Sequence, residues 1–237
     1  MSRSTLLGLS LCIAFAAVPA ISQEVAVGGV RAHIEGIAIP PIADAPFTAK
    51  VVVTWNEPLV GGGIVSRKYY TLVARDSQGR VHREMRGFVP ADSAEEPPLR
   101  SFTILDPVSG TRTTCTKALM TCAASAFDAN LVLTENAADR GNVSGESLGQ
   151  RTIEGLPTAG TRETVSNVSG PRGSSRLAVS HTDAWYSPDL QIDLSVTRTD
   201  PQSGVVTLNV TDLVRGEPDS TWFAIPSGYT VKGGKTQ

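Results

Sequence analysis

An apolar side chain at every second position is the feature that most constrains what this chain can fold into. The clearest run is Leu190, Ile192, Leu194 and Val196, followed after a turn at 200–204 by Val206, Leu208 and Val210. Successive side chains of a strand point to opposite faces of its sheet, so this period predicts strands with one buried and one solvated face.

Segments of similar character recur along the chain at short spacing. They cover 47–56, 67–75, 80–88, 101–105 and 177–186, with turn sequences at 76–79, 106–110 and 187–189. Strands joined by such short turns form an antiparallel meander rather than βαβ units. The sequence therefore predicts a mainly β protein with few short helices.

The N-terminal residues 1–22 have the pattern of a secretory signal peptide. Arg3 precedes the uncharged run 5–21, and Ala20 and Ser22 fit a cleavage after Ser22, with cleavage after Ala20 as the alternative. The run is shorter than the roughly 20 apolar residues that span a bilayer. We expect a protein of the periplasm or the exterior without a membrane span after cleavage. We further expect a poorly ordered leader over 23–45, a single β domain over 46–231 and a tail over 232–237.

Two cysteines remain after such a cleavage, Cys115 and Cys122. A pair of cysteines in an oxidising compartment favours a disulfide, and a hairpin centred on Ala118 and Leu119 places them opposite each other. The same segment, 114–127, also fits an amphipathic helix. Seven residues of helix rise roughly 10.5 Å, beyond the roughly 7 Å that a disulfide allows between Cα atoms, so the two interpretations exclude each other. We favour the hairpin and the disulfide; a helix with free thiols stays open.

The charged and nucleophilic residues argue against several classes of function. The 237 residues carry 21 Lys+Arg against 23 Asp+Glu, with no basic run longer than 67–68, so we expect no nucleic-acid partner. His33, His82 and His181 are far apart in sequence, and we expect no metal site, no cofactor and no catalytic residue. Ser147 lies in a G-x-S-x-G pattern, but a nucleophile elbow needs a strand before it and a helix after it, and neither is predicted there.

Several residue strings together resemble a family of exported proteins abundant in acidobacteria, to which we can assign no activity. They lie at 46–49, 75–80, 83–84, 104–107, 153–155, 160–162, 185–190, 200–201, 215–219, 223–226 and 228–231. The tail W-Y-S-P-D-L…D-P…R-x-E-P-D…F-x-x-P-x-G-Y-T-V is the most specific part. The chain departs from the family's pattern at His82, in the acidic Pro-rich loop 89–98 and in the cysteine hairpin.

More remotely, the order of elements is similar to periplasmic lipoprotein carriers of the LolA type. This resemblance implies a curved antiparallel sheet or incomplete barrel whose concave face holds an apolar ligand such as a lipid or lipoprotein. The function it implies is a periplasmic binding or carrier module, with its ligand-binding residues unassigned. An envelope structural or sensor protein that binds another protein is the alternative, and an enzyme is the third choice.

Overall fold

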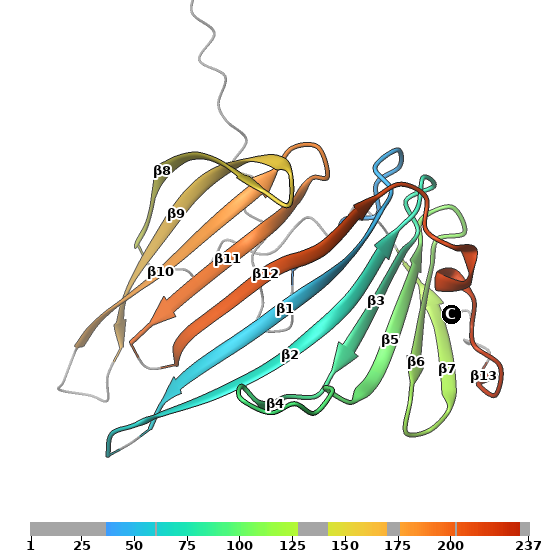
Figure 1. Ribbon diagram of the computed structural model, residues 1–237, viewed down its shortest axis with the longest axis horizontal. Coiled ribbons are helices and arrows are strands. Elements are labelled where there is room, and N and C mark those ends of the chain that lie inside the picture. Colours follow the sequence, from blue (N-terminus) through green and yellow to red (C-terminus); the bar gives the residue numbers. More distant parts are fainter. Residues whose placement is uncertain (1–36, 60, 128–141, 170–175, 202, 233–237) are drawn as a thin grey trace, which may run out of the picture.

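The computed structural model describes residues 37–59, 61–127, 142–169, 176–201 and 203–232, which form one curved, mostly antiparallel sheet (Figure 1). The strands are β1 (Phe47–Pro58), β2 (Ile64–Arg75), β3 (Val81–Arg86), β4 (Val89–Pro90), β5 (Leu99–Asp106), β6 (Thr111–Thr116), β7 (Thr121–Ala126), β8 (Asn142–Ile153), β9 (Leu156–Ser169), β10 (Arg176–Ser187), β11 (Ile192–Asp200), β12 (Gly204–Arg215) and β13 (Thr230–Lys232). The only helix in these ranges is the 3₁₀ turn η2 (Ser220–Phe223). The mainly β, curved-sheet prediction is confirmed.

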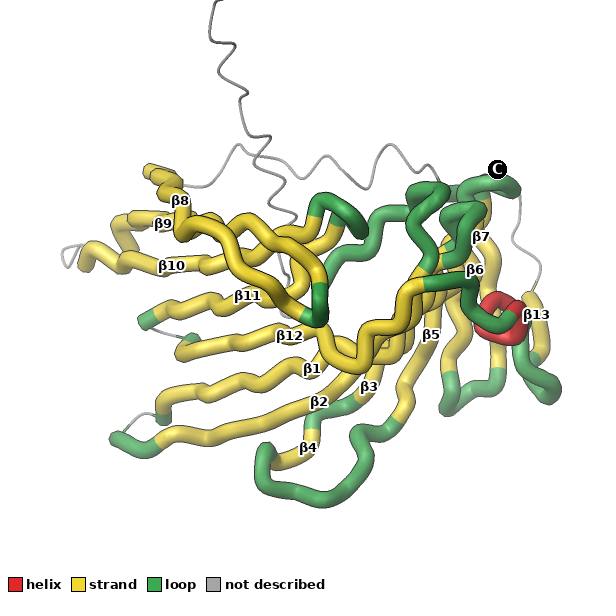
Figure 2. The backbone as a smooth tube through the Cα atoms, turned by 45° about the horizontal axis from the view of Figure 1, so that its top comes forward, coloured by secondary structure: helices red, strands yellow, loops and turns green. Residues whose placement is uncertain are grey.

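Two meanders meet in the middle of the sheet. The strand order is β13-β7-β6-β5-β3-β2-β1-β12-β11-β10-β9-β8, with β4 paired to β2 beside this path. The first meander runs outward from β1 to β7, the second runs inward from β8 to β12, and β1 pairs with β12 where they join. Within the described strands, β13 forms the one parallel pair, with β7. Figure 2 shows the same order along the curved backbone tube.

One face of the sheet, here called face A, carries the main core. It is the face of Phe47, Val51 and Val53 on β1, and the strand register places Val73 of β2 and Leu208 of β12 on the same side. The core also includes the described residues Ile37, Ile39, Ala49, Tyr69, Val81, Leu156, Leu190, Ile192, Leu194, Val196, Val206 and Val210. Because Leu156 is the first residue of β9, directly after the turn at 154–155, the tip of the β8–β9 hairpin lies against face A.

The opposite face, face B, is buried at the other end of the sheet. Val81 pairs with Leu105 on face A, so the neighbouring Ile104 and Phe102 point to face B. There they form a second core with Cys115 and Cys122, against which Phe223 and Tyr229 of the C-terminal segment pack. The sheet therefore changes its buried side between β2 and β5.

The prediction that the run 190–196 has one solvated face is wrong. Leu190 lies in the turn before β11, and all five residues 192–196 are buried. The polar residues Asp193 and Ser195 pair across the strands with Tyr186 and Trp185 of β10. These large side chains stand beside the short polar ones, so both faces of the first half of β11 are covered.

The segment 37–45 does not behave as the predicted poorly ordered leader. Ile37 and Ile39 are buried in the main core, and the backbone of Asp44 donates a 3.0 Å hydrogen bond to the carbonyl of Ser77. A Cβ atom on Gly79 would lie 2.9 Å from the backbone carbon of Ile42, so a glycine in the 76–79 turn allows this close approach. The alternation of Ile37 and Ile39 was the signal for burial. The signal peptide and residues 23–36 lie outside the described residues.

Candidate functional site

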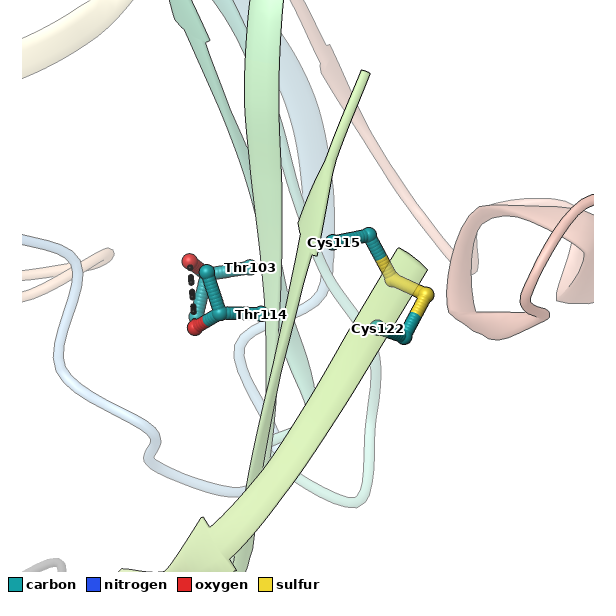
Figure 3. Close-up of a disulfide and its surroundings, with 4 residues drawn as sticks. All are labelled: Thr103, Thr114, Cys115 and Cys122. Atoms are coloured by element: carbon teal, nitrogen blue, oxygen red, sulfur yellow. Dashed lines mark hydrogen bonds between the residues drawn. A yellow bond between two sulfur atoms is a disulfide. The ribbon is translucent and has the colours of Figure 1, made fainter. Parts of the chain in front are cut away.

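The cysteine segment forms a hairpin, as favoured, and the helix interpretation is wrong. Cys115 on β6 pairs with Cys122 on β7, and a disulfide joins them with a Cα–Cα distance of 4.0 Å. Figure 3 shows this disulfide on one side of the strands and the hydroxyl groups of Thr103 and Thr114, 3.4 Å apart, on the other. The disulfide thus lies on the buried side of β6 and β7, while the opposite side presents hydroxyl groups.

The G-x-S-x-G pattern lies inside strand β8 and forms no nucleophile elbow. Ser147 is exposed, and its hydroxyl accepts a 3.2 Å hydrogen bond from the backbone of Gly149. The chain continues as strand to Ile153, whereas an elbow would turn into a helix. In the described part of the chain, Ser147 therefore lacks the strand-to-helix turn of a nucleophile elbow.

The described histidines are separate from each other. His82 is buried on β3, where its ring stacks on Phe102 and meets the edge of Trp222. Burial lowers the pKa of His82, which favours the neutral ring. The Nδ1 atom of His181 lies 2.9 Å from the hydroxyl of Thr164. No group of three potential metal ligands occurs in the described ranges, and His33 lies outside them.

Arg75 is fully buried and joins three parts of the fold. Its guanidinium donates hydrogen bonds to the carbonyl oxygens of Ala45 (2.9 Å), Pro40 (3.1 Å) and Leu190 (2.7 Å), and it lies over the ring of Phe47. Burial lowers the pKa of Arg75 to about 10, which leaves it protonated at neutral pH. Since these three acceptors are backbone carbonyls, this arginine acts as a structural bracket between the segment 37–45 and the turn before β11.

Asp193 is a buried carboxylic acid near the same end of the sheet. Only 2% of its surface is exposed, and its Oδ1 atom has no hydrogen-bond partner among the described residues. Burial raises the pKa of Asp193 to about 7, and burial together with the Asp193 charge raises the pKa of Tyr186. With this pKa, the carboxyl group is partly protonated near neutral pH.

An aromatic group on face A is the strongest candidate for contact with a ligand. The ring of Phe88 lies 4.7 Å from Tyr69 and 6.0 Å from Trp55, and the indole of Trp55 donates a 2.7 Å hydrogen bond to the carbonyl of Ser203. Tyr69 is buried, while 37% of Phe88 remains exposed. Met85, 45% exposed, follows Arg83 on the same face of β3. We call Trp55, Tyr69 and Phe88 the aromatic rim.

The acidic loop that follows β4 is held against face B. The hydroxyl of Tyr70 donates to Glu96, and Arg86 binds Glu96 at 2.8 Å and Glu84 at 2.6 Å. Arg86 and Lys50 both lie over the ring of Tyr70. The loop is therefore anchored to the sheet by Glu96.

Comparison with known proteins gives remote structural similarity only. No family model matches the chain, and no curated protein matches it in sequence. Similar crystal structures include MucB (TM-score 0.39, 13% identity, 81% of this chain), LprF from Mycobacterium bovis (0.29, 14%, 78%) and a LolA superfamily protein from Nitrosomonas europaea (0.31, 9%, 78%). The chain covers 62% of MucB, 90% of LprF and 94% of the LolA superfamily protein. With TM-scores this low, a function for this chain has to rest on its own residues.

Proposed function

We propose that this chain is an exported binding or carrier protein that holds an acyl chain, from a lipid or lipoprotein, on face A. The observation that carries the proposal is the aromatic rim, which extends the apolar core of face A to the solvent at Phe88. Such a surface is already formed in the folded chain. A long hydrocarbon chain can therefore bind there without first ordering a new part of the protein.

Two further observations agree with this function. A disulfide is typical of proteins in oxidising compartments, which supports export. The described histidines and Ser147 have no arrangement for catalysis, so a binding role needs fewer assumptions than an enzyme. No helix among the described residues is long and apolar enough to cross a membrane.

Binding of cis-parinaric acid, a fluorescent fatty acid, tests the proposal on the purified chain. Phe88→Ser removes a partly exposed ring that could supply about 1.5–3 kcal/mol of apolar contact to a ligand, so we expect the Kd to rise about tenfold or more. Val108→Ser is the matched control, because Val108 is 75% exposed in the turn between β5 and β6. Equal affinities of the two variants, or no binding by the parent chain, would contradict the proposal.

The alternative is an envelope protein that binds another protein through its sheet edge. The specific observation is β8, a twelve-residue strand at the end of the sheet whose described side chains are nearly all exposed. An irregularity between Ser147 and Gly149 interrupts its register, and such bulges discourage pairing with another strand. Native mass spectrometry of protein taken from its own compartment separates the two candidates, since a bound lipid supports the carrier.

A further inference from the structure

The C-terminal segment 216–232, here called the C-terminal strap, crosses face B and ends as a strand beside β7 (Figure 1). It begins at Gly216, whose backbone donates to the carbonyl of Pro46, and its η2 turn contacts β3. The ring of Trp222 meets His82, and the guanidinium of Arg80 lies over Phe223. Aromatic side chains thus account for much of its attachment to the sheet.

The C-terminal strap covers the disulfide. Cys115 and Cys122 are 0% and 1% exposed, and Phe223 and Tyr229 pack against the cluster that contains them. The ring of Tyr229 lies 5.6 Å from that of Phe102, between the strap and the sheet. A thiolate must reach a sulfur atom to exchange with a disulfide, so burial at this level blocks the reaction while the strap is in place.

The strap is in turn held by the strand that the disulfide fixes. Val231 of β13 pairs with Cys122 itself, and the backbone of Thr230 donates a 2.9 Å hydrogen bond to the carbonyl of Met120. Strand β7 has β6 as its neighbour on the other side, and the disulfide links these two strands. All three residues of β13 are exposed, so its attachment depends on β7 staying in register.

We infer that the disulfide and the C-terminal strap form a redox-sensitive switch. The docked strap shields the disulfide from a reductant, and the closed disulfide keeps the strap docked. While the disulfide is closed, β7 is fixed and the strap stays docked. A thiol of a dithiol reductant attacks the Cys115–Cys122 bond and forms a mixed disulfide with one of the two cysteines. The second thiol of the reductant then displaces that cysteine. Two electrons and two protons pass to the protein, which ends with two thiols, and the reductant leaves as its own disulfide. Strand β7 then loosens, the strap leaves, and the apolar surface of face B around Phe102 becomes accessible.

The rate of disulfide reduction by dithiothreitol in the native chain tests the first half of the coupling. Phe223→Ser combined with Tyr229→Ala removes the covering side chains, so we expect reduction to accelerate about tenfold or more, because exchange follows the open population. Val214→Ser is the matched control, with Val214 63% exposed at the end of β12, and should react as the parent does. Unchanged rates in the double variant, with an unchanged far-ultraviolet spectrum, would overturn the inference.

Hydrogen exchange of the parent chain tests the second half without any substitution. The amide of Thr230, which is bonded to Met120, should exchange about tenfold faster after reduction than before it. Amides in the middle of β1 should keep their protection, since the main core lies on face A. Equal protection of the Thr230 amide in the oxidised and reduced chains would show that the strap does not depend on the disulfide.

Discussion

Ionising the carboxyl group of Asp193 costs free energy in the folded chain, because the group is buried. Its folded pKa of about 7 stands above the ordinary value of 3.8 for an aspartic acid, because burial penalises the charged form. The folded state therefore binds the proton more tightly than the unfolded state. The stability from this group is fully present below pH 3.8 and is lost as pH rises to about 7.

Asp193→Asn should remove this pH dependence. Since one pKa unit corresponds to about 1.4 kcal/mol, the variant should gain up to about 4 kcal/mol in unfolding free energy at pH 8 relative to the parent, and little at pH 4. Urea denaturation at both pH values measures the difference. Asp92→Asn, at an exposed loop position, serves as the control. A parent chain as stable at pH 8 as at pH 4, with the same profile in Asp193→Asn, would contradict this account.

Arg75→Leu should destabilise the fold by about 3 kcal/mol or more. The change leaves the carbonyls of Pro40, Ala45 and Leu190 without the donors they now have, and each unpaired buried acceptor costs about 1–3 kcal/mol. Chemical denaturation measures the loss. Arg198→Leu, at an exposed position of β11, should change stability by about 0.5 kcal/mol or less. Equal losses of unfolding free energy in the two variants would show that the hydrogen bonds of Arg75 contribute no more than an exposed arginine does.

At the scale of elements, the cysteine hairpin should depend on its disulfide. In the chain-entropy account, closing an eight-residue loop stabilises by about 2–3 kcal/mol. Replacing Cys115 and Cys122 by serine together should lower the unfolding free energy by that amount. Alkylation of protein from the oxidising compartment, without reductant and followed by mass analysis, should leave both cysteines unmodified. Alkylation of both thiols would show that Cys115 and Cys122 are not joined by a disulfide in that compartment.

The elements that sequence could predict are those whose pattern is local. The period of two in β1 and β12 and the turn at 76–79 are read from neighbouring residues, and the structure confirms them. The burial of Asp193 and Ser195 depends on Trp185 and Tyr186 from another strand, so no local pattern contains it. The change of the buried face between β2 and β5 likewise depends on the C-terminal segment, which returns from more than a hundred residues later.

The candidate site was less predictable than the fold for the same reason. Trp55, Tyr69 and Phe88 come from three segments, and only the register of β1, β2 and β4 brings their rings together. No local sequence pattern singles out Phe88. The hairpin with Cys115 and Cys122 was easier to predict, because both partners lie within eight residues.

At the scale of the whole molecule, the two buried faces divide the sheet into parts with different roles. Face A between β1, β2 and β10–β12 combines the main core with the aromatic rim, and it is covered in part by segment 37–45 and the β8–β9 tip. Face B at β5–β7 is covered by the C-terminal strap. A ligand on face A and a released strap on face B therefore use separate surfaces of one sheet.

Separating folding from binding is the decisive test at this scale. Leu208→Ser places a hydroxyl in the main core, so it should cost a few kcal/mol and lower the melting temperature with or without lipid. Phe88→Ser removes a partly exposed ring, so it should lower the melting temperature of the lipid-free chain less than Leu208→Ser does. It should instead abolish most of the rise that added fatty acid produces, because a ligand stabilises only in proportion to its affinity for the native state. Ser147→Ala and His181→Ala should change neither quantity. If Ser147→Ala removed a measurable hydrolytic activity at an unchanged melting temperature, the carrier function would give way to an enzyme.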